Sequence, residues 1–212
     1  MTASDPETAA APPSPKAEQV LQAASRVFRE QGYGSASMDA IAREAGVSKA
    51  TLYAHFAGKD QLFAAIVGAE CRSHSQALTA PDIDRLEVRQ ALAAIGRNFL
   101  DLVLSAKARA IYRIVIAEAP RFPELGRAFY ASGPAAVLAR LADYLGAADA
   151  RGTLRVEDPK LAAEQFVAML MGPLHMRHLL GLTAEFGDRD PAQVVEAAVA
   201  TFLSAYAPSD PA

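Results

Sequence analysis

The sequence contains no tryptophan and only one cysteine, Cys71. A single thiol cannot close an internal disulfide, so the disulfide frameworks of small secreted domains are excluded. No run approaches the roughly 18 consecutive apolar residues that a membrane-spanning helix needs. The opening stretch MTASDPETAAAPPSP has neither the basic nor the apolar segment of a secretory signal. These absences predict a cytoplasmic protein that does not enter a membrane.

Catalytic and metal-binding motifs are also missing. Neither G-x-S-x-G nor H-E-x-x-H occurs, so no hydrolase is indicated. His175 and His178 form an H-x-x-H pair, but no third ligand stands at a suitable spacing and structural zinc needs four. We therefore predict no catalytic residue, no cofactor and no metal, and we interpret the two histidines as core or pocket residues.

The sequence also lacks strand patterns, and its apolar residues recur at helical spacing instead. No segment alternates apolar and polar residues between turn signals, whereas alanine-rich stretches such as LAAEQFVAML carry apolar residues at helical spacing. The expected fold class is all-α. Its domains are expected to be a disordered arm (1–14), a DNA-binding domain with a helix-turn-helix (15–58), a connecting helix (59–80) and a regulatory, ligand-binding and dimerisation domain (81–207).

Three serines mark helix starts in the N-terminal domain. Ser14, Ser37 and Ser48 each precede an apolar periodic segment, where an N-cap is expected. Gly46 closes the second of these helices after only two turns. Two short helices joined by a tight turn are typical of the helix-turn-helix.

Long helices are predicted in the C-terminal half, with a break at Gly133 and Pro134. The last two, about 161–181 and 191–206, are apolar around most of their circumference. Because such helices would be poorly covered in a monomer, we expect them to form a homodimer interface, a four-helix bundle made by two copies.

The segment SMDAIAREAGVSKATLYAHFAGKDQLFAAIV resembles the DNA-binding signature of the TetR family of bacterial transcriptional regulators. Further along, RIVIAEAPRFPELGRAFYASGP resembles the ligand domain of the AefR-like branch of that family. The resemblance implies a regulator, with double-stranded operator DNA and a small effector as its partners.

The third helix is the expected reading element. Seven residues span about 10 Å, which suits a major groove about 12 Å wide. Val47, Leu52 and Phe56 are expected to pack inward. The opposite face presents Ser48, Lys49, Thr51, Tyr53 and His55.

Lys49 is the strongest candidate for a base contact, because lysine can donate to guanine N7 and O6; the alternative is a solvated surface lysine. The family resemblance places phosphate contacts at Tyr53, His55 and Lys59. It also places Ser37 and Met38 where the family often has a phosphate-contacting threonine. Methionine has no hydroxyl, so that contact would pass to Ser37 or to backbone N–H groups.

Charge gives the DNA-binding interpretation little support. The formal net charge is −3, and residues 16–60 contain six basic and five acidic side chains. The usual basic footprint is therefore missing. We expect a modest salt dependence of DNA binding. Each neutralised phosphate contributes about −0.9 to the slope of the logarithm of the binding constant against the logarithm of the salt concentration.

Together these features predict a repressor that binds a palindromic operator as a dimer and is released by a small, largely apolar effector. The alternatives are a helical enzyme or ligand carrier without DNA binding, and an activator of the same fold. The resemblance implies a cavity between the middle helices, for which the candidate lining residues are Phe99, Val103, Tyr112, Ile116, Phe129, Met169 and His175.

Overall fold

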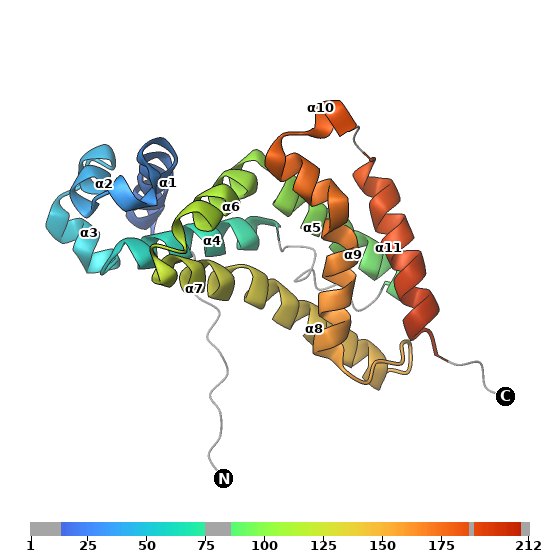
Figure 1. The fold of residues 1–212 in the computed structure, drawn as a ribbon. Coiled ribbons are helices and arrows are strands. Elements are labelled where there is room, and N and C mark those ends of the chain that lie inside the picture. The colour runs from blue at the N-terminus through green and yellow to red at the C-terminus, as the bar shows by residue number, and fades with distance from the viewer. Residues whose placement is uncertain (1–13, 75–85, 187–188, 209–212) are drawn as a thin grey trace, which may run out of the picture. The chain divides into compact units, whose positions relative to one another are not determined.

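The computed structural model describes residues 14–74, 86–186 and 189–208 (Figure 1). In this part of the chain all regular secondary structure is helical and no strand occurs, which confirms the predicted all-α fold. The predicted disordered arm lies outside the described residues except for Ser14, and so do residues 81–85, the start of the predicted regulatory domain. None of the described helices is both long and apolar enough to cross a membrane.

The chain divides into two compact units, 1–62 and 63–212. The first contains α1 (Pro15–Ser35), α2 (Met38–Glu44), α3 (Lys49–His55) and the start of α4 (Lys59–His74). All three predicted serine caps are confirmed. The hydroxyl oxygens of Ser14, Ser37 and Ser48 accept hydrogen bonds from backbone N–H groups three residues on, at 3.2, 3.1 and 3.1 Å.

The first unit is held by a small apolar core between α1, α2 and α3. Val20, Ile41 and Leu52 are fully buried, and Phe28 packs on Tyr33 with ring centroids 5.4 Å apart. The turn between α2 and α3 depends on Gly46, whose φ of 64° lies in the left-handed region. A side chain there would be strained, because L-residues rarely adopt this conformation.

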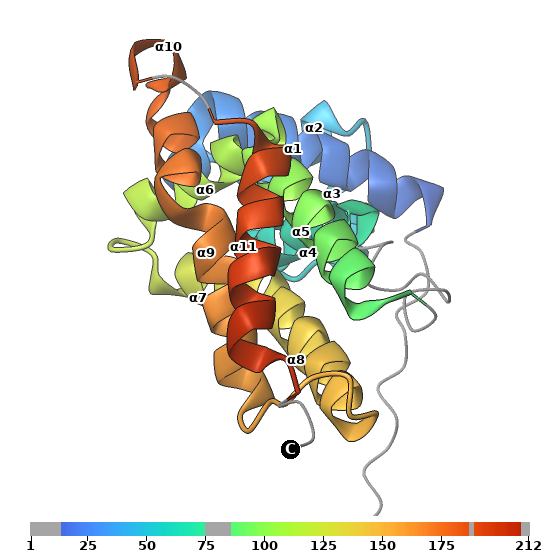
Figure 2. The ribbon, with the colours of Figure 1, turned by 90° about the vertical axis from the view of Figure 1, so that its right-hand side faces the viewer.

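The second unit contains the remainder of the helices (Figures 1 and 2). They are α5 (Val88–Leu104), α6 (Ala106–Glu118), α7 (Pro123–Ser132), α8 (Pro134–Ala150), α9 (Pro159–Leu180), α10 (Thr183–Phe186) and α11 (Pro191–Tyr206). The predicted break at Gly133 is confirmed, since α7 ends before it and α8 begins after it. Sequence periodicity did not reveal α10 or the kink in α9 at Gly172, where φ is 31°.

The core of the second unit lies where α5, α8, α9 and α11 pack together. Phe166 of α9 meets Phe202 of α11 edge to face, with ring centroids 5.2 Å apart. Val195, Val199 and Phe202 are all buried within the chain. The apolar stripe of α11 is therefore covered by its own unit, and the expectation that it requires a partner copy was wrong for these residues. On α9, in contrast, Met176 is 62% exposed and Leu180 is 61% exposed.

Candidate recognition helix and buried cavity

Helix α3 presents two different faces. Leu52 is fully buried and Phe56 is 9% exposed, as expected for the inward face, while Val47 is half-buried. Of the predicted contact residues, Ser48, Lys49, Tyr53 and His55 are exposed, and Thr51 is half-buried. All five are therefore at least partly accessible.

The first turn of α3 is organised by two hydroxyl groups. Ser48 Oγ accepts from the Thr51 backbone N–H and lies 2.8 Å from Thr51 Oγ1. This bond satisfies one of the amide groups that a helix start leaves without an intrahelical partner. The other N–H groups at the helix start remain oriented to favour an anion such as phosphate.

Lys49 is held by an acidic neighbour. Its Nζ lies 2.5 Å from Asp39 Oδ2 on α2, and both side chains are more than half exposed. Neither our sequence interpretation of a base contact nor that of a solvated lysine anticipated this ion pair. A base contact by Lys49 requires the ion pair to open.

Replacing Asp39 by asparagine is expected to strengthen binding to every DNA sequence. The change removes a negative charge beside the DNA-facing surface and frees Lys49. An exposed ion pair contributes about 0.2–1 kcal/mol, so we expect a gain of up to about fivefold in affinity per half-site. Titration of labelled duplexes measures it, with Asp39→Glu as the control that keeps the charge. A weaker complex with Asp39→Asn would show instead that Asp39 orients Lys49.

The start of α2 carries the next two predicted contacts. Met38 is 9% exposed, so its side chain belongs to the core of the unit and is not placed to contact DNA. Ser37 is exposed and caps the helix through Ala40 N–H. The alternative of a contact through Ser37 or the backbone N–H groups stays a prediction.

Lys59 is tied to the end of α1. Its ammonium donates to the carbonyl oxygens of Tyr33 at 2.8 Å and Gly34 at 3.4 Å, and it lies 4.8 Å from the centroid of the Tyr33 ring. An ammonium has three N–H donors. Two are used within the chain, so at most one remains for a phosphate.

Replacing Lys59 by methionine is therefore expected to have two effects. Losing hydrogen bonds from a charged donor should lower the free energy of unfolding by about 1.5–3 kcal/mol, although methionine keeps part of the apolar stem. Losing the phosphate contact should weaken binding to all sequences equally and make the salt slope less steep by about 0.9. Thermal unfolding measures the loss of stability, and DNA titrations at several salt concentrations measure the loss of the phosphate contact. An unchanged salt slope would leave Lys59 a purely structural role.

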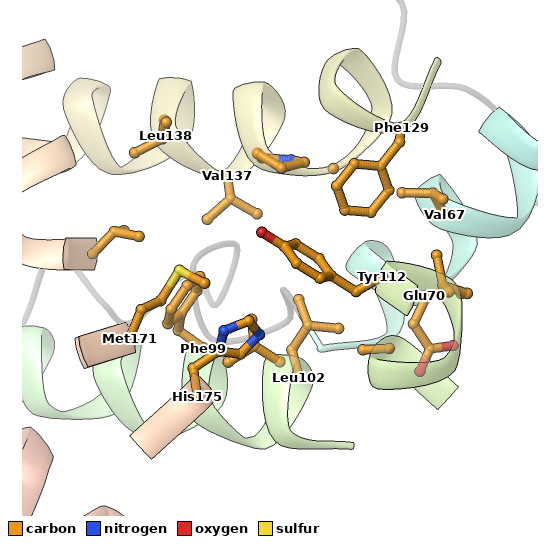
Figure 3. A pocket seen from close by; sticks show the side chains of 16 residues that line it. Val67, Glu70, Phe99, Leu102, Tyr112, Phe129, Val137, Leu138, Met171 and His175 are labelled. Carbon is orange, nitrogen blue, oxygen red and sulfur yellow. The ribbon is translucent and has the colours of Figure 1, made fainter. Parts of the chain in front are cut away.

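The second unit contains a cavity of about 130 Å³. Figure 3 shows side chains from α4, α5, α6, α8 and α9 surrounding it, with Phe129 from α7. Five of the predicted lining residues are among them: Phe99, Val103, Tyr112, Phe129 and His175. The other two are not. Ile116 is 56% exposed, and Met169 lies beside a separate groove between α9 and α11.

Several lining residues were not predicted, including Val67 and Glu70 of α4 and Met171 of α9. Val167, Met171 and His175 recur every fourth residue, which places them along one face of α9. That spacing was visible in the sequence and could have identified Met171. Nothing in the sequence indicated that α4 contributes to the cavity, because this requires a contact between distant segments.

The polar groups of the lining come mainly from three residues. Tyr112 makes edge-to-face contacts with Phe129 and His175, at centroid distances of 5.7 and 5.3 Å. Burial lowers the pKa of His175 below its usual range, and neighbouring His178 lowers it further. Both effects favour the neutral form of the imidazole. Glu70 is paired with Lys107 at 2.5 Å.

Two arginines of α6 fasten the end of α9 beside this cavity. Arg109 Nη1 donates to the carbonyl oxygen of His178 at 3.2 Å, and Arg113 Nε donates to that of Leu179 at 2.8 Å. Positive charge is favourable at a helix C-terminus. These bonds hold α6 and α9, the helices that carry Tyr112 and His175, against each other.

The groove between α9 and α11 has a volume of about 480 Å³. Pro173 of α9 and Ala197 and Thr201 of α11 line it, together with Arg177. Figure 2 shows the two helices side by side. Elsewhere, within the described residues, no group of three or more histidine, cysteine or acidic side chains is placed to hold a metal ion.

Family models match most of the chain. Residues 20–66 match the model described as bacterial regulatory proteins, tetR family, and residues 90–208 match the AefR-like transcriptional repressor, C-terminal domain. Among characterised relatives, the activator FasR of Mycolicibacterium smegmatis is 38% identical over 85 residues, and the regulator SrpR of Pseudomonas putida is 33% identical over 100 residues. These matches cover 40% and 47% of this chain, and 39% and 45% of the relatives, less than half the length of either.

Solved structures resemble the chain over nearly its whole length. The Flavonoid-responsive Regulator FrrA is 41% identical with a TM-score of 0.76, and the similarity covers 91% of this chain and 97% of FrrA. The SmeT–triclosan complex is 25% identical with a TM-score of 0.62, covering 93% and 94%. SmeT is described as the repressor of a multidrug efflux pump of Stenotrophomonas maltophilia.

Proposed function

This chain belongs to the TetR family of DNA-binding transcriptional regulators and carries the AefR-like C-terminal domain. We propose that it is a repressor that binds a palindromic operator as a homodimer. We further propose that a small, largely apolar effector releases it from the operator. The family consists of regulators and not of enzymes. The observation that carries the effector part of the proposal is the largely apolar cavity of the second unit.

The exposure of side chains on α3 supports the DNA-binding part. The side chains of Ser48, Lys49, Tyr53 and His55 are available to a duplex, and the helix is held from behind by buried Leu52. The unit has little excess positive charge. Specific binding is then expected to depend on two copies of the reading head, about 34 Å apart on one face of the duplex.

The surface of α9 supports the dimer. Met176 and Leu180 are large apolar side chains with more than half their surface exposed. The groove between α9 and α11 is lined by Pro173 and small residues of α11, together with Arg177 and Arg189. A second copy of α9 and α11 would cover this surface and complete a four-helix bundle. The interface proposed from residues 161–206 therefore rests on α9 and the groove, and no longer on the buried stripe of α11.

Two relatives support the effector class. FrrA is flavonoid-responsive and SmeT forms a complex with triclosan. Both compounds are aromatic, and a cavity lined largely by apolar side chains suits such a molecule. By linkage, an effector that binds the DNA-free state better weakens operator affinity by the same factor.

Repression is favoured over activation by the C-terminal match, since residues 90–208 match an AefR-like repressor domain. The match to the activator FasR extends over only 85 residues. An activator of the same fold therefore remains the second candidate.

Selection of bound sequences from random DNA with the full-length protein tests the proposal. We expect enrichment of a palindrome, and lower recovery when a flavonoid or triclosan is present. Absence of any enriched sequence would contradict operator binding. Enrichment that neither compound changes, or higher recovery with either compound, would contradict release by this effector class.

A further inference from the structure

Two polar side chains of the cavity lining make no hydrogen bond within the described residues. They are His175, which is 7% exposed, and Tyr112, which is half-buried. Figure 3 shows both among the side chains that surround the cavity. A ligand in this space can therefore supply the hydrogen-bonding partner that the imidazole and the hydroxyl lack.

Aromatic packing fixes the orientation of both groups. The Tyr112 ring lies at 77° to Phe129 and at 86° to His175, so it is held from two directions. The bonds from Arg109 and Arg113 keep α6 against the end of α9. The two polar groups are thus presented at fixed positions, which is what selection among ligands requires.

The charges around the cavity disfavour ionic ligands. Burial favours the neutral form of His175, whose ring offers one donor and one acceptor. The carboxylate of Glu70 is already paired with Lys107. A ligand carboxylate or ammonium would therefore lose its water without gaining an opposite charge, which is strongly unfavourable.

Size restricts the ligand further. A dry apolar cavity of about 150 Å³ holds one benzene molecule, and the volume here is about 130 Å³. Met171 is an unbranched side chain in the lining, and such side chains adapt to larger occupants. The space thus suits one aromatic ring, or slightly more when Met171 moves.

We propose that Tyr112 and His175 form a hydrogen-bonding pair that selects neutral phenolic effectors, with the phenol O–H donating to an imidazole nitrogen and the phenol oxygen accepting from the Tyr112 hydroxyl. This deepens the proposed function and rests on the cavity being the effector site. The pair determines which aromatic molecules bind, whereas the apolar lining supplies affinity for all of them.

Two probes of nearly equal shape test the proposal. Phenol has a hydroxyl group where toluene has a methyl group, and each is a single aromatic ring of the size that the cavity suits. The measured quantity is the ratio of the two dissociation constants for the full-length protein, obtained by titration calorimetry. We expect Tyr112→Phe and His175→Leu each to reduce the preference for phenol about tenfold. His175→Gln should retain most of the preference, because an amide also donates and accepts.

Met171→Leu is the matched control, since it alters the apolar lining and should change both affinities by the same factor. Thermal unfolding of each variant identifies any that fail to fold, and Tyr112→Phe keeps the shape of the ring. A preference that is identical in the wild type, Tyr112→Phe and His175→Leu would overturn the proposal. Binding of neither probe to the wild type would also overturn it.

Operator binding without probe is measured in parallel. If the wild type does not bind operator DNA, the proposed function is contradicted. The ratio of probe affinities would still report on Tyr112 and His175. The two failures are therefore distinguishable.

Discussion

Replacing Lys49 by alanine is expected to weaken binding to the operator far more than binding to random DNA. A lysine that donates to guanine N7 and O6 contributes about 1–3 kcal/mol of discrimination, and a dimer loses this contact twice, so the expected loss of specificity is about 2–6 kcal/mol. The structure adds a condition, because Lys49 must leave Asp39 before it can donate to a base.

Competition between operator and scrambled duplexes measures this loss. Lys59→Met is the matched control, because loss of the Lys59 ammonium should weaken binding to both duplexes by the same factor. If Lys49→Ala and Lys59→Met weakened specific and random binding by the same factor, the division between a base-reading and a phosphate-binding lysine would be wrong. The double variant Asp39→Asn/Lys49→Ala then reports whether Asp39 acts only through Lys49.

Placing an arginine at Ala197 is expected to disrupt the dimer and reduce operator affinity about 10²- to 10⁴-fold. Ala197 is exposed on α11 and lines the groove beside α9. A long charged side chain there would have to be desolvated against a second copy, which is unfavourable. Linking two reading heads raises apparent affinity by this factor, so a monomer loses it.

Sedimentation at micromolar concentration gives the oligomeric state, and duplex titration gives the affinity. Ala147→Arg is the matched control, since Ala147 is also an exposed alanine within a long helix, on α8. It should leave both measurements unchanged. A wild-type monomer at this concentration, or an Ala197→Arg variant that remains dimeric, would remove α9 and α11 as the interface.

Several basic side chains of the DNA-binding unit have partners within the unit. Arg26 is paired with Glu44 at 2.8 Å, Lys49 with Asp39, and Lys59 bonds carbonyl oxygens of α1. Several cations of this unit thus have partners in the free protein. DNA binding at Lys49 then exchanges one partner for another, which is why we expect a modest salt dependence and a response to Asp39→Asn.

The sequence by itself determined the features that depend on near neighbours in the chain. Ser14, Ser37 and Ser48 cap helices because the capping bond joins residues three apart. The left-handed Gly46 and the break at Gly133 are equally local, since each depends on the conformations open to one or two residues. Leu52 and Phe56 are buried as their four-residue spacing predicted.

Only the tertiary structure decided which partner each functional side chain meets. The Lys49–Asp39 pair spans ten residues, and Lys59 meets Tyr33 across 26. Side chains of α4 and α9 line the same cavity, whereas Ile116 and Met169 do not line it although both are apolar. Periodicity gives the face of a helix but not the helix that covers it, because that choice depends on packing between segments distant in the chain. The apolar stripe of α11 is an example. Its position could be predicted from the sequence, but only the tertiary structure showed that α5 and α9 cover it.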